Sequence, residues 1–298
     1  MMYHIPVLLN ECIKGLNIHP EGIYVDVTFG SGGHSRKILE MLSSGRLIAF
    51  DRDKDVQGNL VEDDRFSFIH QNYRYLKNFL KFQGVQKIDG LLADLGISSW
   101  QIDQPERGFS IRLDGDLDMR MDQGQELNAA DIINSYSSDQ LIQLFRKYGE
   151  IDNARKLAEE ILHERAIQRI ESTGSLKNII LRVALRGKEN QYLARAFQAI
   201  RIEVNEELDS LKELLQHTCD ILKPGGRMVV ISYHSLEDRM VKNYFRTGNF
   251  EGIPVKDFFG HQIAPLHPVN RKAIIPSEEE KLANPRSKSA KLRIAEKI

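Results

Sequence analysis

The stretch Ile23–Gly33 (IYVDVTFGSGG) decides the fold class of this 298-residue chain. Its first part, Ile23–Phe29, is rich in β-branched and aromatic residues, a composition that predicts a buried strand. The segment Gly30–Gly33 follows directly and leads into an amphipathic stretch from about His34 to Leu42. A strand that runs through a glycine-rich turn into a helix is typical of the first unit of a nucleotide-binding α/β domain.

The alternation of strands and helices continues beyond this unit. Short apolar runs predict strands at Arg46–Asp51, Phe66–His70 and Ile88–Asp94, and a helix is predicted at Tyr73–Gln83. Because these runs are apolar almost throughout, we expect a parallel sheet that is covered by helices on both faces. The fold class is therefore α/β.

A helical segment interrupts this alternation. Residues 101–124 are polar and rich in glycine, and residues 129–201 show the spacing of amphipathic helices. The later elements are predicted to be a helix at about Asn205–Leu222, a strand at Arg227–Ser232, a helix at about Leu236–Phe245, and short strands near Lys272–Ile275 and Lys291–Ala295. We therefore predict one α/β domain made of residues 1–103 and 207–298, with a helical domain of residues 104–206 inserted into it.

The composition excludes several classes of protein. Two cysteines are too few for a disulfide scaffold or a cysteine-rich zinc site, and no metal is expected. No run approaches the ~18 apolar residues of a membrane span, so we expect a cytoplasmic protein that does not contact a membrane. The 41 basic residues balance the 42 acidic ones, which argues against a uniformly basic nucleic-acid binder.

The glycine-rich turn predicts a cofactor site together with Asp51, which ends the second strand 21 residues after Gly30. A carboxylate at that place in a doubly wound sheet lies where a ribose diol binds. The chain has no phosphate-binding P-loop motif, and a dinucleotide fingerprint is incomplete because Ser35 stands where its last glycine would be. S-adenosylmethionine is favoured over a nicotinamide dinucleotide, which stays a distant alternative.

Seven motifs occur in order along the chain and are more specific than the glycine turn. They are His4–Glu11 (HIPVLLNE), Asp26–Arg36 (DVTFGSGGHSR), Asp94–Gln101 (DLGISSWQ), Arg107–Asp122 (RGFSIRLDGDLDMRMD), Phe197–Asn205 (FQAIRIEVN), Ser232–Arg239 (SYHSLEDR) and Asn284–Arg293 (NPRSKSAKLR). Over nearly the whole chain, this series resembles the bacterial RsmH (MraW) family. Members of that family methylate the exocyclic N4 of a decoding-centre cytidine in 16S rRNA and use S-adenosylmethionine.

The resemblance implies a class I (Rossmann-like) methyltransferase with a helical domain inserted after the fourth strand. It also implies that the cofactor is bound by Gly32, Gly33, His34, Asp51, Tyr73, Asp94 and Gln101. The first three would contact the methionine part, Asp51 the ribose and Tyr73 the adenine. The chain departs from the family pattern at Trp100, at Asp116 and at residues 191–194 (QYLA).

Methyl transfer to an amino nitrogen requires positioning and a proton acceptor. Asp94 is the first candidate acceptor, and Ser98 or a backbone carbonyl near it is the second; alternatively, Asp94 serves only the cofactor. Methylation at cytosine C5 would need a cysteine nucleophile, but Cys12 and Cys219 both lie in apolar surroundings and are expected to be buried.

Further residues are candidates for contact with the substrate. His234 could stack on a flipped base, although a helix cap by Ser235 with Asp238 would explain part of its motif. Arg120 could line the substrate entrance or pair within its own acidic loop. Arg195 lies in a basic segment, residues 153–201, which has ten Lys and Arg against five acidic residues.

The uneven charge predicts contact with RNA. The tail, residues 281–298, has six basic residues and one acidic residue, whereas residues 102–149 have nine acidic and five basic residues. Arg165 with Arg169, and Arg182 with Arg186, are each spaced to share a helix face. We expect 16S rRNA as the partner, within a small ribosomal subunit or an assembly intermediate. The sequence leaves open whether the protein forms a homodimer, and an RNA-binding assembly factor without turnover is the alternative function.

Overall fold

The computed structural model describes residues 6–298, so the first two residues of the motif that begins at His4 lie outside it. The chain forms two compact units. Unit 1 consists of the described residues up to Gly96 together with Leu208–Ile298, and unit 2 is Ile97–Glu207. Unit 2 thus begins at Ile97, seven residues before the start that we expected from the sequence.

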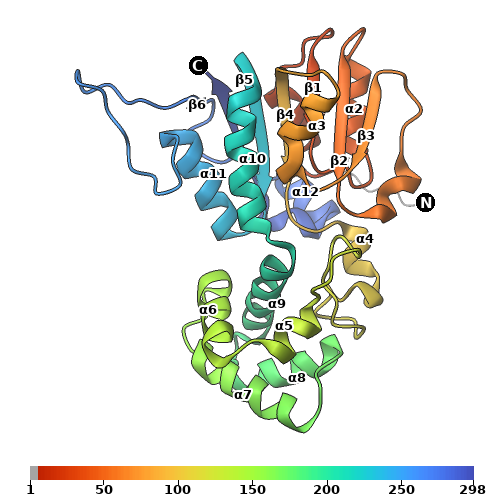
Figure 1. The fold of residues 1–298 in the computed structure, drawn as a ribbon, viewed down its shortest axis with the longest axis vertical. Helices are drawn as coiled ribbons and strands as arrows, with labels where there is room; N and C mark the ends of the chain where they lie inside the picture. Colours follow the sequence, from red (N-terminus) through yellow and green to blue (C-terminus); the bar gives the residue numbers. More distant parts are fainter. Residues whose placement is uncertain (1–5) are drawn as a thin grey trace. The chain divides into compact units, whose positions relative to one another are not determined.

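Unit 1 is built on one sheet (Figure 1). Within residues 6–298 its seven strands lie in the order β3-β2-β1-β4-β5-β7-β6. They are β1 (Ile23–Asp26), β2 (Arg46–Asp51), β3 (Phe66–His70), β4 (Ile88–Asp94), β5 (Leu222–Ser232), β6 (Leu266–Pro268) and β7 (Lys291–Lys297). The strands β1 to β5 are parallel, and β7 runs antiparallel to β5 and to β6. The predicted doubly wound α/β fold is confirmed.

Helices cover both faces of the sheet. On one face the apolar side chains of the strands pack with α3 (Leu76–Phe82), α10 (Glu207–Ile221) and α11 (Ser235–Thr247). On the other face they pack with α1 (Leu9–Leu16) and α2 (Gly33–Met41). Central side chains such as Val25, Ile48 and Leu91 are fully buried, as the near-continuous apolar strands predict.

The structure differs from the sequence prediction at three places. The strand predicted at Arg227–Ser232 begins earlier, at Leu222, and the turn at Lys223–Gly226 lies inside β5 as an irregularity of its pairing with β4. Residues 272–275 form no strand, because only Ile274 pairs with Leu292. The helix α1 and the short strand β6 were not predicted, because their few apolar residues give no sustained periodicity.

Unit 2 is helical. Its helices are α4 (Ser99–Asp103), α5 (Ala129–Ser135), α6 (Ser138–Gly149), α7 (Ala154–Ile167), α8 (Thr173–Val183) and α9 (Glu189–Asn205). Apolar residues at helical spacing, such as Leu141, Leu144 and Phe145 of α6, are buried between these helices. The helices α6 and α9 make the most extensive contact, and α6 also packs on α7.

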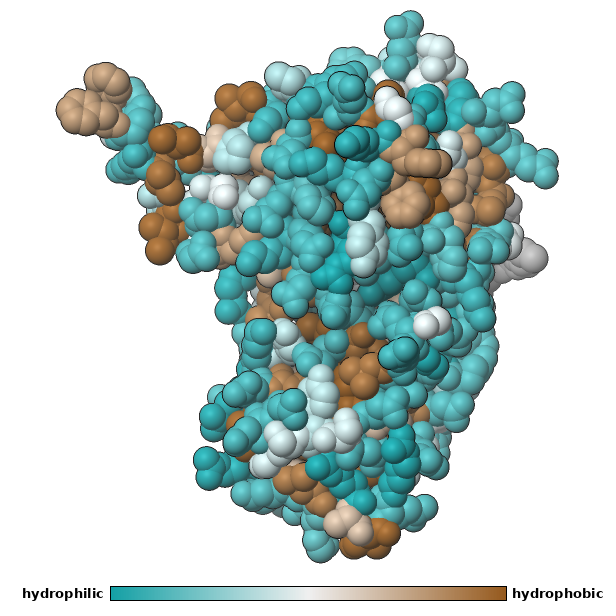
Figure 2. All heavy atoms as spheres, viewed as in Figure 1, coloured by the Kyte–Doolittle hydropathy of each residue, from teal (hydrophilic) through white to brown (hydrophobic). Residues whose placement is uncertain are grey.

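A loop after α11 carries apolar side chains into solvent. Figure 1 shows it projecting from unit 1, and Figure 2 shows brown and tan side chains along it. Phe258 is 98% exposed and Phe259 is 80% exposed, and their rings meet edge to face. No helix among residues 6–298 has both the length and the apolar character that crossing a bilayer requires.

Candidate active site

The carboxyl ends of adjacent strands of the sheet carry three aspartates. Asp51 ends β2, Asp26 ends β1 and Asp94 ends β4, and these strands are neighbours in the order β2-β1-β4. In an open parallel sheet this edge holds the ligand, at the point where successive connections leave toward opposite faces. The three side chains and the glycine turn between them form the candidate site in unit 1.

The glycine turn has the backbone geometry that the sequence predicts. Gly30 (φ 51°) and Gly32 (φ 75°) are both left-handed, and Gly32 caps the N-terminus of α2. A Cβ at Gly32 would lie 2.8 Å from Arg36 Nη1, and one at Gly33 would lie 2.2 Å from Pro6 Cγ. Glycine is therefore required here both by conformation and by close packing.

Asp51 ties the turn to the second strand. Its Oδ2 accepts a hydrogen bond from the backbone N–H of Gly30 at 2.8 Å, and its Oδ1 accepts one from Asp53 at 2.9 Å. Burial raises the pKa of Asp51, and the two N–H donors oppose that rise. Each carboxylate oxygen can accept a second hydrogen bond, so the side chain can still hold a diol.

Asp26 is the structural centre of the turn. It is 1% exposed and accepts hydrogen bonds from Ser35 Oγ at 2.7 Å and from the backbone N–H of Thr28 at 3.1 Å. Burial raises its pKa to about 6, against the effect of these donors. This role was not predicted from the sequence, because Asp26 lies in the middle of the predicted strand Ile23–Phe29, whereas in the structure β1 ends at Asp26.

Asp94 is held from two neighbouring strands. Its backbone N–H donates to Thr28 Oγ1 at 2.7 Å, and its Oδ1 accepts a hydrogen bond from the hydroxyl of Tyr233 at 2.8 Å. Burial raises the pKa of Asp94 to about 7. Thr28 and Tyr233 were not predicted as site residues from the sequence, although each lies in one of the seven family motifs.

His34 and Tyr73 take different places at this edge. The ring of His34 is 6% exposed, and its Nε2 lies 3.2 Å from the carbonyl oxygen of Val7. A ligand at the turn would therefore meet the backbone of His34 rather than its ring. Tyr73 opens the short turn after β3 and packs, partly exposed, against the core.

The other predicted residues belong to unit 2. Ser98 and Gln101 form a capping box at the start of α4, with Gln101 N–H donating to Ser98 Oγ at 3.2 Å. Arg120 forms a bidentate ion pair with Asp118 at 2.7 Å, so its guanidinium is engaged within its own loop. Arg195 is exposed on α9. Because the two units are separate bodies, the roles of these four residues stay predictions.

Much of the predicted basic face is paired. Arg165 donates to the carbonyls of Ile133 and Tyr136, Arg169 pairs with Asp131 at 2.8 Å, and Arg182 pairs with Glu164. In the tail, Arg293 pairs with Asp238 at 2.6 Å and Lys291 approaches the same carboxylate at 3.3 Å. These cations therefore already have acidic or carbonyl oxygens of their own unit as partners, which the count of basic residues in the sequence does not show.

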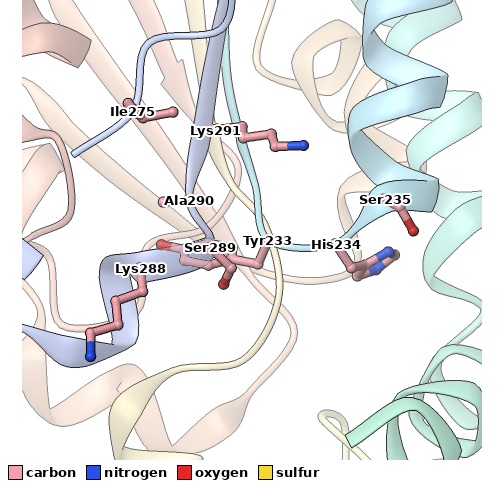
Figure 3. A pocket seen from close by; sticks show the side chains of 8 residues that line it. All are labelled: Tyr233, His234, Ser235, Ile275, Lys288, Ser289, Ala290 and Lys291. Atoms are coloured by element: carbon pink, nitrogen blue, oxygen red, sulfur yellow. The ribbon is translucent and has the colours of Figure 1, made fainter. Parts of the chain in front are cut away.

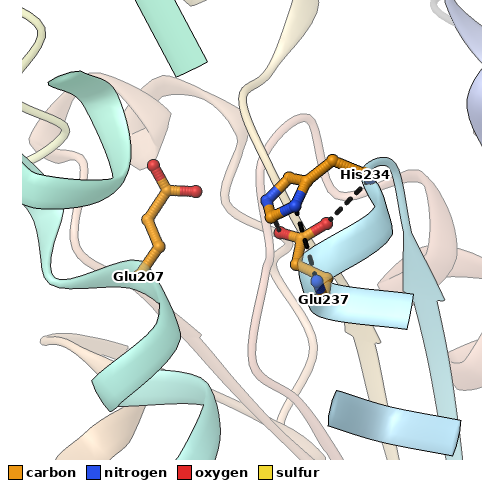
Figure 4. A group of neighbouring side chains, drawn as sticks. All are labelled: Glu207, His234 and Glu237. Atoms are coloured by element: carbon orange, nitrogen blue, oxygen red, sulfur yellow. Dashed lines mark hydrogen bonds and ion pairs between the residues drawn. The ribbon is translucent and has the colours of Figure 1, made fainter. Parts of the chain in front are cut away.

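His234 caps the helix after β5. Its Nδ1 accepts a hydrogen bond from the N–H of Glu237 at 3.4 Å (Figure 4). In addition, Glu237 Oε2 accepts one from the N–H of Tyr233 at 2.9 Å. The cap therefore lies one residue before the predicted Ser235 and Asp238 pair.

A cavity of about 230 Å³ opens beside this cap in unit 1. Its lining runs from Tyr233, His234 and Ser235 across to Ile275 and to residues 288–291 (Figure 3). The cavity thus lies next to Tyr233, the residue that directly follows β5.

Cysteine chemistry has no support at this site. Cys12 and Cys219 are free and buried, as predicted, and burial raises the pKa of the Cys12 thiol. A protonated, buried thiol is a poor nucleophile.

Comparison with known proteins identifies the family. A family model described as the MraW methylase family matches residues 1–298. The ribosomal RNA small subunit methyltransferase H of Bacteroides fragilis (strain YCH46) is 53% identical over 296 residues, which cover 99% of this chain and 97% of that protein. The protein of that name from Cytophaga hutchinsonii is 54% identical over 298 residues, which cover 99% of this chain and all of the relative.

A solved structure of an rRNA methylase from Streptococcus thermophilus covers 100% of this chain and 99% of its own, with 12% identity and a TM-score of 0.44, too low to support an inference. The full-length family match and the identity above 50% agree with the glycine turn and the acidic strand ends. The chain belongs to the MraW methylase family.

Proposed function

We propose that this methyltransferase transfers a methyl group from S-adenosylmethionine to the exocyclic N4 of a decoding-centre cytidine in 16S rRNA. The observation that carries the proposal is the full-length identity of 53% to proteins named as small-subunit rRNA methyltransferases. The acidic carboxyl edge of the sheet supports it, because it supplies a cofactor cradle and a candidate proton acceptor.

The residues at the edge fit S-adenosylmethionine. The left-handed Gly30 and Gly32 leave room beside the start of α2, and a Cβ at Gly30 would meet nothing closer than 3.9 Å. Asp51 matches a ribose diol and Tyr73 offers an aromatic ring next to the end of β3. The cofactor has no phosphate, and accordingly the strand ends beside the turn carry the acidic side chains of Asp26, Asp51 and Asp94.

The cofactor supplies an electrophilic methyl group on a sulfonium. The protein then has to hold the amino nitrogen about 3 Å from that methyl group, in line with the bond to sulfur. A proton must leave the nitrogen after the new bond forms, and Asp94 is the proposed acceptor. Its pKa of about 7 suits a base that must accept a proton near neutral pH and release it again.

The partner is proposed to be 16S rRNA within a small ribosomal subunit or an assembly intermediate, in the cytoplasm. The target base must leave its stack to reach the site, and the helical unit is proposed to hold the flanking RNA. Homodimer formation is a separate proposal, which size-exclusion chromatography with light scattering would test.

The test is methyl transfer to small subunits isolated from cells that lack this protein. With labelled S-adenosylmethionine, the wild-type protein should produce N4-methylcytidine, detected by nucleoside mass spectrometry, and Asp94→Asn should reduce kcat by about 100-fold or more. Binding of both ligands without any transfer would instead support the alternative of an assembly factor without turnover.

A further inference from the structure

We propose that Tyr233 is a positioning residue for this reaction: its hydroxyl fixes one oxygen of Asp94 and leaves the other to accept the proton from the target amino group. This inference rests on the proposed role of Asp94. The two residues lie at the ends of adjacent parallel strands, since Asp94 pairs with Ile231 in the ladder of β4 and β5. The hydroxyl of Tyr233 lies 2.8 Å from Asp94 Oδ1.

Tyr233 is itself held in place. Its backbone N–H donates at 2.9 Å to Glu237 Oε2, a carboxylate that also forms the capping box of α11 with His234. Gly96, which follows β4, has φ +93°, a conformation that favours glycine, and a Cβ built there would lie in ordinary van der Waals contact with Tyr233 Cδ2 at 3.5 Å. The ring also packs against the apolar cluster of α1, α2 and the sheet. The hydroxyl is therefore aimed at Asp94 by the fold.

Within the described part of the chain, residues 6–298, hydrogen bonding to the Asp94 carboxylate is confined to Oδ1. Among residues 6–298, no hydrogen bond to Oδ2 is found, whereas Oδ1 is bound by Tyr233 and the backbone N–H by Thr28. The side chain is partly exposed, so Oδ2 can reach a ligand. The hydrogen bond to Oδ1 restricts rotation of the carboxylate and so fixes the direction in which Oδ2 points. A carboxylate without a hydrogen-bond partner would lack this restriction.

The surroundings of Asp94 mostly disfavour its charge. Burial is the main cause that raises the pKa of Asp94, and the acidic side chains of Asp26 at the end of β1 and Glu237 on α11 raise it further. The thiol of Cys12 on α1 also faces this carboxylate and is protonated. The hydroxyl of Tyr233 is the neighbour that favours the carboxylate, and its own raised pKa keeps it a donor.

Methyl transfer leaves one proton that Asp94 has to accept. When the bond between N4 and the methyl carbon forms, the bond from carbon to sulfur breaks and its electron pair stays on sulfur. The amino nitrogen then carries one proton too many, and that proton passes to Asp94 Oδ2. Asp94 must be ionised for this step, so activity should rise with pH through its pKa.

The test is Tyr233→Phe, compared with Tyr244→Phe as the matched control. Tyr244 lies on α11 of the same unit, where its ring stacks on Phe250 at a centroid distance of 4.9 Å. Removing the Tyr233 hydroxyl should lower kcat for small subunits by about 5-fold at pH 7, with KM for S-adenosylmethionine within about two-fold. The acidic limb of the kcat profile should move to higher pH by about one unit, and activity should recover above it.

A second variant guards against a folding defect. Replacing Tyr233 with 3,5-difluorotyrosine keeps the shape of the side chain but makes the hydroxyl a stronger donor, so the acidic limb should move to lower pH. An unchanged limb in both variants, or a change in KM alone, would overturn the inference. If Asp94→Asn keeps wild-type kcat, the proposed acceptor itself is wrong; if it is inactive while both Tyr233 variants keep the wild-type profile, only the positioning role is wrong.

Discussion

Gly32 shows how one backbone conformation governs the cofactor cradle. Its φ of 75° is left-handed, and the added methyl group of Gly32→Ala would lie 2.8 Å from both Arg36 Nη1 and Phe29 Cζ. We expect this variant to cost roughly 1 kcal/mol in the free energy of unfolding and to weaken binding of S-adenosylhomocysteine by about 10-fold or more. Isothermal titration calorimetry and urea unfolding measure the two effects.

Gly58→Ala is the matched control for Gly32→Ala. Gly58 is exposed, its φ is not left-handed, and an added Cβ would meet nothing within 4 Å. Stability and cofactor affinity should both stay at wild-type values. Equal effects of the two substitutions would show that the geometry of Gly32 has no special importance.

The sequence predicts which side chains end the strands but not which residues those side chains contact. Asp51 and Asp94 were found because each closes an apolar run, and the order of the strands then places them at one edge. The bond between Tyr233 and Asp94 joins residues 139 positions apart. It depends on β4 pairing with β5 in one register, which no local pattern determines.

The helices α11 and α6 both begin with a capping box, and this pair allows a controlled prediction for a single element. In α11, Glu237 Oε2 accepts from the N–H of the cap residue His234 at 3.4 Å and from that of Tyr233 before it at 2.9 Å; in α6, Gln140 accepts from the N–H of the cap residue Ser137 at 2.8 Å. Substituting either with Ala should cost about 1 kcal/mol of stability. Only Glu237→Ala should also lower kcat, because only that cap fixes the backbone of Tyr233.

Thermal unfolding and initial rates of methyl transfer check this pair of caps. A loss of kcat in Gln140→Ala as large as that in Glu237→Ala would mean that general destabilisation, rather than the position of Tyr233, explains the effect.

Element boundaries were less predictable than element types. The run Arg227–Ser232 was identified as a strand, but β5 begins at Leu222, because the Pro-Gly-Gly turn is accommodated as an irregularity. Gly226 permits this: a Cβ there would lie 2.9 Å from the carbonyl oxygen of Lys223 and 3.0 Å from that of Asp89. Residues 272–275 have the composition of a strand, yet a single pairing with β7 does not make one.

The single tryptophan offers a test at the scale of the whole molecule. Trp100 lies in unit 2, with the guanidinium of Arg107 5.4 Å from the centre of its ring, so its fluorescence reports on that unit. The two units have separate cores, and we expect the urea transition followed by fluorescence to differ from the one followed by far-UV circular dichroism. Trp100→Phe should remove the fluorescence signal and keep the dichroism curve; coincident transitions would contradict the prediction.

The net charge of this protein does not indicate whether it binds RNA, whereas the distribution of charge along the chain is more informative. The chain sums to -1, but its acidic and basic residues are concentrated in different segments. Even that distribution overstates the number of basic side chains that are available to bind RNA. Arg165, Arg169 and Arg182 all bind groups within unit 2, and only the folded structure shows those partners.

The position of unit 2 in the chain has a consequence for biosynthesis. Asp94 and Ile231 are ladder partners although they are 137 positions apart, and most of the residues between them belong to the helical unit. As the chain leaves the ribosome, β4 therefore emerges long before the strand that will cover its open edge. At ordinary rates of translation the delay is on the order of ten seconds, which is ample time for the contiguous helical unit to fold first. The nascent sheet has to keep an apolar edge from aggregating during that interval.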